Sequence, residues 1–185
     1  MNCLPAVLST YFWRNIEIED IKLALQTFIP LASQTPGRLN MFQFKQFKFL
    51  VDFAHNPAGL ELLCDFIGKM DGEPKVGIIS GTGDRRDEDI MELGRISGRS
   101  FDEIIIRQDK NLRGRTAEEI VNLLVKGINE TKPGDIPITI IYNEKEAIMH
   151  AYNTAKPGSL ITIMCDVVAE ALDLIKALKE KEDSE

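Results

Sequence analysis

The sequence of 185 residues has few of the side chains that crosslink small domains or hold metal ions. It contains 3 cysteines and 2 histidines. Cys3, Cys64 and Cys165 lie far apart, form no CxxC pair and are odd in number, whereas disulfide frameworks and zinc sites need paired or clustered ligands. We therefore expect reduced thiols in the core and no metal site.

Long apolar runs and an excess of basic charge are also missing. No apolar run reaches the roughly 18 to 20 residues that span a bilayer, and the beginning, MNCLPAVLSTYFW, lacks the basic region of a signal peptide. The formal net charge is −7, whereas nucleic-acid binders carry an excess of Lys and Arg. These absences predict a cytoplasmic protein that binds neither nucleic acid nor membrane.

The phosphate-binding fingerprints GxGxxG and GxxxxGK[ST] are absent too. The first predicted strand is followed by AHNPAGL and the second by GTGDRRD. A P-loop is therefore not predicted, and an independent NAD-dependent Rossmann enzyme is disfavoured because its first strand should lead into the glycine fingerprint.

What the sequence does contain, from about residue 48 onward, is an alternation of short apolar runs with longer amphipathic stretches. This pattern is typical of repeated β-loop-α units, and it predicts an α/β fold with a Rossmann-like, mostly parallel sheet and helices on both faces. The predicted strands span 47–53, 76–80, 103–107, 138–142 and 160–164, and the predicted helices span 58–70, 88–99, 116–130, 144–155 and 167–181.

The first 46 residues follow a different pattern. Helical stretches are predicted at 4–13 and 19–28, followed by the breaker run PLASQTPGR and by the alternating segment LNMFQF, which predicts an antiparallel edge strand. A chain that opens inside an apolar helix is typical of a piece of a longer protein. We expect a helical appendage over 1–35, an α/β domain over 36–180 and a solvated tail over 181–185.

Ligands of open parallel sheets bind beyond the carboxyl ends of the strands, so the residues after each strand are the candidates. Asp52, His55 and Asn56 follow the first predicted strand. Histidine readily changes charge or donates to phosphate near neutral pH. The alternative is that Asn56 caps the next helix and His55 is a surface residue.

The second predicted strand leads into Gly81, Gly83, Asp84 and Arg85. A glycine-rich turn that enters a helix can direct backbone amides at an anion. The alternative is a flexible loop in which Asp84 and Asp87 cap the helix and the arginines are solvated or paired with the aspartates.

The third predicted strand is followed by Asp109, Arg113 and Arg115. Guanidinium groups on such a loop suit bidentate recognition of carboxylate or phosphate, and a solvated basic loop is the alternative. Thr116 and Glu119 have the spacing of a capping box. Before the edge strand, Pro36 and Gly37 predict a turn, which leaves Arg38 without a structural role.

In this order, the segments TPGR, VDFAHNP, GTGDRRDED and DKNLRGR resemble the C-terminal domain of the Mur ligase superfamily. GDRRDED followed by LRGR is similar to the cyanophycin synthetase branch, and the resemblance covers nearly the whole chain. It implies a lid that closes over a separate central domain, which holds ATP through a P-loop and Mg²⁺. The implied chemistry is activation of a carboxylate as an acyl phosphate and attack by an amine. Residues 2–28 resemble the closing helices of that central domain.

The resemblance also implies roles for the candidate residues. Arg38 and Asp52 match positions that contact the nucleotide, and Gly81, Gly83, Asp84 and Arg85 join them as the expected cofactor-binding set. His55 and Asn56 match positions near the reacting centre. Asp109, Arg113 and Arg115 lie where the incoming amino acid, here arginine, is recognised. The run RQDKN and the ending MCDVVAEAL depart from the general Mur pattern.

Two hypotheses follow. The first is a lid of an ATP-dependent amide ligase that acts on an amino acid and a polymer and is inactive without a ligase core, supplied in cis or in trans. The second is a repurposed, non-catalytic binding or interaction module for a nucleotide, a small anion or a partner protein. A homo-oligomer is compatible with both.

Overall fold

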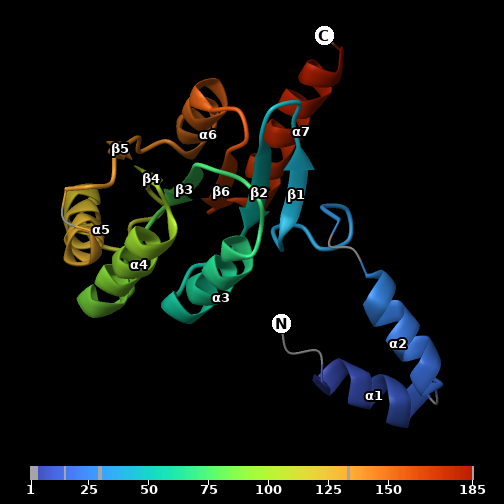
Figure 1. The fold of residues 1–185 in the computed structure, drawn as a ribbon. Helices are drawn as coiled ribbons and strands as arrows, with labels where there is room; N and C mark the ends of the chain where they lie inside the picture. The colour runs from blue at the N-terminus through green and yellow to red at the C-terminus, as the bar shows by residue number, and fades with distance from the viewer. Residues whose placement is uncertain (1–3, 15, 29–30, 133, 185) are drawn as a thin grey trace. The chain divides into compact units, whose positions relative to one another are not determined.

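The computed structural model describes residues 4–14, 16–28, 31–132 and 134–184. The chain forms two compact units, Met1–Pro30 and Leu31–Glu185. Figure 1 shows the helical first unit in blue and the α/β second unit in the remaining colours. Cys3 lies outside the described residues, whereas Cys64 and Cys165 are free and buried.

The first unit consists of α1 (Leu4–Arg14) and α2 (Ile18–Thr27). No residue of α1 is buried, and Ile21 is the one buried residue of α2. Many of the large apolar side chains of this unit are exposed, namely Leu4, Leu8, Tyr11, Phe12, Trp13, Ile16, Ile18, Leu23, Leu25 and Phe28. This unit therefore has an apolar surface and almost no core of its own. Isolated helices shorter than about 12 residues are also marginal in water.

The second unit is built on one six-stranded sheet with the order β1-β2-β6-β3-β4-β5. The strands are β1 (Asn40–Gln43), β2 (Lys48–Asp52), β3 (Lys75–Ile79), β4 (Glu103–Ile106), β5 (Ile138–Ile140) and β6 (Leu160–Met164). β1 pairs antiparallel with β2, and all other pairings are parallel. The predicted fold class is confirmed, including the antiparallel edge strand. The last strand, β6, lies in the middle of the sheet.

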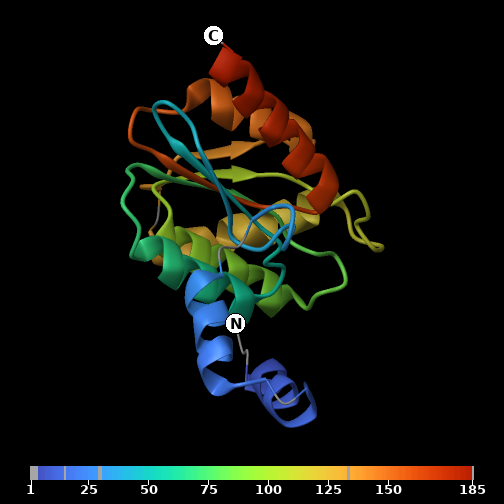
Figure 2. The ribbon, with the colours of Figure 1, turned by 90° about the vertical axis from the view of Figure 1, so that its right-hand side faces the viewer.

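Helices cover both faces of this sheet. α3 (Pro57–Gly68), α4 (Asp87–Ser100) and α5 (Ala117–Thr131) pack on one face, and α6 (Glu144–Thr154) and α7 (Val168–Ser184) pack on the other. Figure 2 shows the red α7 and the orange α6 opposite the green and yellow helices. Because both faces are covered, β6 is buried along its whole length.

Local signals in the sequence fix where several helices begin. The Asn56 side chain accepts a 2.8 Å hydrogen bond from Gly59 N, and Pro57 occupies the first turn of α3. Thr116 and Glu119 form the predicted capping box of α5. These contacts satisfy backbone donors that have no partner inside a helix.

Several element boundaries differ from the predictions. The predicted tail 181–185 is helical as far as Ser184, because α7 continues to that residue. Glu182 accepts a 2.9 Å hydrogen bond from Lys45 N, which ties the end of the helix to the β1–β2 turn. The fourth predicted strand ends at Ile140 instead of Tyr142, and Arg107 lies just beyond the end of β4.

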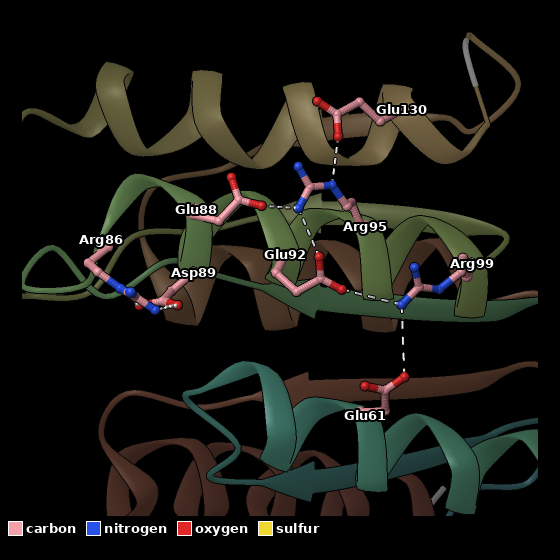
Figure 3. Close-up of polar contacts among 8 residues, drawn as sticks. All are labelled: Glu61, Arg86, Glu88, Asp89, Glu92, Arg95, Arg99 and Glu130. Atoms are coloured by element: carbon pink, nitrogen blue, oxygen red, sulfur yellow. Dashed lines mark hydrogen bonds and ion pairs between the residues drawn. The ribbon is translucent and has the colours of Figure 1, made fainter.

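Arginine side chains join α4 to its two neighbours. The Arg95 guanidinium contacts Glu88 and Glu92 of its own helix at 2.6 and 2.8 Å and Glu130 of α5 at 2.6 Å. Figure 3 shows this cluster and, beside it, Arg99, which reaches toward Glu61 of α3. In the part of the chain that the structure describes, no helix is long and apolar enough to cross a membrane.

Candidate ligand-binding site at the carboxyl edge of the sheet

A cavity of about 180 Å³ opens at the carboxyl ends of the parallel strands. The loops that follow β2, β3, β4 and β6 all contribute to it, because β6 lies between β2 and β3. Its lining residues are Phe53, Ala54, His55, Ser80, Thr82, Arg85, Arg107, Asp109, Arg113, Cys165 and Asp166. Four of the predicted site residues therefore meet at one cavity, namely His55, Arg85, Asp109 and Arg113.

The loop after β2 gives His55 and Asn56 different surroundings. His55 is exposed, and its Nδ1 lies 3.1 Å from the carbonyl oxygen of Phe53. The Asn56 side chain is engaged in capping α3, as the structural alternative predicted. A reacting-centre role for either residue stays a prediction, and His55 is the one whose side chain lines the cavity.

Arg38 lies in the turn before β1, and Asp52 is the last residue of β2, directly before this loop. Asp52 Oδ2 accepts a 2.9 Å hydrogen bond from Leu39 N, and the Arg38 guanidinium lies over the Phe53 ring, 5.5 Å from its centre. Burial raises the pKa of the Asp52 carboxyl, and the hydrogen bond from Leu39 and the nearby Arg38 partly offset this. Phe53 lines the cavity, whereas Arg38 and Asp52 are not among its lining residues.

The glycines of the second loop pack against the protein. A Cβ on Gly83 would lie 1.9 Å from the carbonyl oxygen of Leu112, and one on Gly81 would lie 2.8 Å from Ile120 Cγ2. A side chain at Gly83 would clash with the backbone, and one at Gly81 would require Ile120 to shift. The predicted capping by Asp84 and Asp87 is wrong, because Arg86 is the residue that precedes α4 and no side chain caps it.

The third loop contains three predicted residues with three different environments. Asp109 accepts hydrogen bonds from Ser80 Oγ at 2.8 Å and from Arg107 Nη1 at 2.5 Å. Arg113 pairs with Asp84 across the two loops. Arg115 donates to backbone oxygens of the second loop. Asp109 and Arg113 line the cavity, and Arg115 is not among its lining residues.

Arg107, which sequence reasoning treated as the end of a strand, is the largest fully buried side chain of the domain. It contacts Asp109, Glu144 Oε2 at 3.2 Å and the carbonyl oxygen of Met164. Burial raises the pKa of Glu144, and the adjacent Arg107 partly offsets this. The signal that could have revealed Arg107 is its place directly after a buried strand.

Cys165 and Asp166 were also missed, because nothing in the sequence places β6 at the centre of the sheet. Cys165 Sγ contacts the backbone oxygen of Asp52 at 3.4 Å, and burial raises the pKa of this thiol to about 12. The thiol is therefore protonated at neutral pH and a poor nucleophile. Asp166 accepts a 2.8 Å hydrogen bond from Lys110 N, which joins the β6–α7 and β4–α5 loops.

Arg85 differs from the other arginines of this edge. Its Nε and that of Arg107 are both buried without a hydrogen-bond partner among the described residues. Arg107 forms ion pairs with Asp109 and Glu144, whereas the Arg85 guanidinium forms none with the described residues. A buried donor without a partner is rare in folded proteins. Because the side chain lines the cavity, Arg85 is the group best placed to receive an anionic ligand.

A second cavity, of about 480 Å³, shares Asp109 and Asp166 with the first. Its lining includes four carboxylates, from Asp109, Glu144, Asp166 and Glu170, and two lysines, Lys110 and Lys145. No group of three or more His, Cys, Asp or Glu side chains that could hold a metal ion occurs among the described residues.

Comparison with known proteins gives a consistent assignment. Residues 37–166 match the model of the family described as Mur ligase, glutamate ligase domain. The chain is 39% identical over 178 residues to a cyanophycin synthetase of Synechocystis sp.; this match covers 96% of the chain but only 20% of the relative. The match therefore includes most of the Met1–Pro30 unit, which lies outside the family model. The chain spans about a fifth of the length of such relatives.

Solved structures show the same fold. A UDP-N-acetylmuramoyl-L-alanyl-D-glutamate--2,6-diaminopimelate ligase aligns with a TM-score of 0.64 at 19% identity, over 94% of this chain and 37% of that one. A Mycobacterium tuberculosis folylpolyglutamate synthase complexed with ADP and AMPPCP aligns with a TM-score of 0.61 at 20% identity, over 86% of this chain and 35% of that one. In both, the matched part is about a third of a longer protein.

Proposed function

The chain belongs to the Mur ligase family, in its glutamate ligase domain, and on this premise we propose that it is the lid of an ATP-dependent amide ligase of the cyanophycin synthetase type. The lid would help to bind ATP and the incoming amino acid over a separate P-loop core, supplied in cis or in trans. The 39% identity to a cyanophycin synthetase supports this branch of the family.

The observation that carries the proposal is the basic cavity at the carboxyl edge of the sheet. Arg85, Arg107 and Arg113 line it, and Arg85 has a buried nitrogen without a partner. Its volume of about 180 Å³ lies below the range of about 300 to 1,000 Å³ that is usual for pockets of larger ligands. The cavity thus suits a phosphate or carboxylate group, and the remainder of a nucleotide would need walls from another domain.

ATP and Mg²⁺ would be held mainly by that other domain. The sequence contains no P-loop, and the described residues do not form a cluster suited to a metal ion. This chain would contribute Arg38 from the turn before β1, Asp52 from the end of β2 and the loop that contains Arg85. A lid of this kind supplies charge and excludes water from an acyl phosphate when it closes.

The second cavity supports arginine as the incoming amino acid. Four carboxylates line it against two lysines, and a guanidinium pairs well with carboxylates. The first cavity, beside it, has the arginines that a carboxylate requires. An amino acid with an anionic and a cationic end would match this pair of cavities across Asp109 and Asp166.

The first unit fits a role as a docking segment for the core. Its helices expose large apolar side chains such as Phe12 and Trp13, which are 76% and 87% exposed. Exposed apolar patches of this kind mark interaction surfaces. Residues 1–35 would therefore belong structurally to the core of a longer ligase, and the cytoplasm, where ATP is available, is the proposed location.

The test combines activity with binding. The purified chain should turn over no ATP, because it lacks the core. Addition of a separately expressed cyanophycin-synthetase core should restore ADP release that requires arginine and an acidic acceptor, and Arg85→Gln should lower that rate. ATP turnover by the purified chain alone would overturn the proposal.

Calorimetry separates this function from that of a repurposed binding module. A lid should bind ATP or arginine only weakly without its core. Tight binding of a nucleotide, a small anion or an acidic peptide by the purified chain, with no gain on adding the core, would favour the binding module instead.

A further inference from the structure

The arginines at the carboxyl edge of the sheet fall into two groups. Most have side chains that bond to other protein groups, and one, Arg85, has no such bond among the described residues. Arg86 pairs with Asp89, Arg107 with Asp109 and Glu144, and Arg113 with Asp84. Arg115 is the most extensively bonded arginine of its own loop. Its Nε donates to Gly83 O at 3.0 Å, and its Nη2 donates to Arg85 O at 2.9 Å and pairs with Asp87 Oδ1 at 2.7 Å. Within the part of the chain that the structure describes, Arg85 is the arginine of this group whose side chain has no such partner.

The bonds of Arg115 fall on the turn that carries Arg85. Arg85 N donates to Thr82 O at 3.0 Å, which closes the turn. The Arg115 guanidinium then holds two carbonyls of this turn and the first residue of α4. Gly83 packs directly against the backbone of Leu112, so the two loops are in close contact at the same point. Arg115 therefore bonds to the turn at three points, while the Arg113–Asp84 ion pair is a second link between the two loops.

We propose that Arg115 is a positioning residue: it clips the β3–α4 loop to the β4–α5 loop and thereby directs Arg85 into the cavity. Arg115 then binds no ligand itself, in contrast to the role that the sequence suggested. This inference rests on the proposed function only for the identity of the ligand, because the clip itself exists without one.

Planar guanidinium geometry is essential to this arrangement. Arginine presents five donors in a rigid fork, whereas lysine is a point charge with a single nitrogen. Lysine at position 115 would keep the charge but could not span the two carbonyls and the Asp87 carboxylate together. If Arg115 acted through its charge or by contacting an anion, Arg115→Lys would keep much of the function. If it acts as a clip, Arg115→Lys should behave like Arg115→Gln.

The experiment follows arginine Nε–H signals by NMR in the full chain, first without ligand. We expect Arg115→Gln and Arg115→Lys to shift the Arg85 signal and to speed amide exchange of residues 82–87. Arg86→Gln is the matched control, because Arg86 lies in the same loop and pairs with Asp89 on the exposed side. An Arg85 signal that stays unchanged in both Arg115 variants would overturn the clip.

The second step titrates inorganic phosphate. The loss of a charge-assisted contact costs about 1.5–3 kcal/mol, so both Arg115 variants should weaken phosphate binding about tenfold or more, and Arg86→Gln should leave it within about twofold. Arg85→Gln should abolish it. Full phosphate affinity in Arg115→Lys would overturn the positioning role.

The two proposals fail in different ways. If wild type binds no phosphate while the Arg115 variants still displace the Arg85 signal, the anion site of the proposed function is wrong and the clip is supported. Should an Arg115 variant fail to fold, Asp87→Ala removes one of the three contacts and should shift the Arg85 signal in the same direction. An unchanged signal in that variant counts against the clip.

Discussion

Arg107 is a cation buried between two carboxylates. Its side chain is 2% exposed, and those of its partners Asp109 and Glu144 are 12% and 13% exposed. Removal of one member of such a group leaves buried charges without compensation. Arg107→Met should therefore lower the free energy of unfolding by about 3–5 kcal/mol, as measured by urea denaturation. If Arg107→Met lowered the free energy of unfolding no more than the exposed control Arg86→Met, the buried carboxylates of Asp109 and Glu144 would not depend on the Arg107 charge.

The stability of the domain should depend on pH through Asp52, in a direction that follows from the pKa of this carboxyl. Burial raises its pKa in the folded state above the ordinary value of 3.8. A group of this kind stabilises the fold fully below its unfolded pKa, and this contribution is lost as the pH rises through the folded pKa. Wild type should therefore lose stability relative to Asp52→Asn as the pH rises above the ordinary pKa of 3.8 and through the raised folded-state pKa.

Comparing wild type with Asp52→Asn isolates the contribution of Asp52 to the pH dependence of stability, because every other titratable group is present in both proteins. Urea unfolding at a series of pH values provides the measurement. A difference that moves in the opposite direction would mean that the hydrogen bond from Leu39 and the charge of Arg38 outweigh burial.

At the scale of residues, the sequence predicted four of the eleven residues that line the cavity. His55, Arg85, Asp109 and Arg113 were found because they follow strands that the apolar pattern reveals. Arg107 was missed because it looked like part of a strand. Cys165 and Asp166 were missed because their importance depends on the position of β6, which requires tertiary contacts that no local pattern encodes.

Among the elements, α4 and α5 pack unusually closely because glycines lie at their contact. A methyl group at Gly127 would lie 2.0 Å from Met91 O, and one at Gly94 would lie 2.3 Å from Leu124 O. Gly127→Ala must separate the helices and should lower the free energy of unfolding by about 1–3 kcal/mol, as measured by urea or thermal denaturation.

Gly68 is the matched control for this substitution. It is the last residue of α3, and a methyl group there meets no atom within 4 Å. Gly68→Ala should therefore be neutral or stabilise the fold by up to about 0.5–1 kcal/mol, since glycine is unfavourable in a helix. Equal effects of the two substitutions would show that the α4–α5 contact can relax.

The elements themselves were largely predictable. Every helix and strand that the periodicity indicated is present, with bounds that match or differ by up to three residues. The errors fall at ends, where local preference is weak: β5 is three residues long, and the charged segment 181–184 is helical because Glu182 has a partner in the β1–β2 turn. The close α4–α5 contact was not predicted, because glycines inside a helical pattern do not reveal what they face.

For the whole molecule, the arrangement of the sheet determines where chemistry can occur. The insertion of β6 between β2 and β3 brings the loops of four strands to one edge. Both hydrophobic cores consist entirely of residues from the Leu31–Glu185 unit. This unit therefore has what an independent fold requires, whereas the Met1–Pro30 unit has one buried residue among those described in its helices.

This asymmetry predicts the effect of removing residues 1–30. The truncated chain should unfold cooperatively, with a melting temperature within about 4 °C of the full chain, the shift that about 1 kcal/mol produces at this size. It should also bind less of a hydrophobic dye and self-associate less, because the exposed Phe12 and Trp13 are gone. The substitutions Phe12→Ser and Trp13→Ser in the full chain provide the control and should lower dye binding without affecting the melting temperature. Loss of cooperative unfolding in the truncated chain would mean that the α/β unit depends on the helices before it.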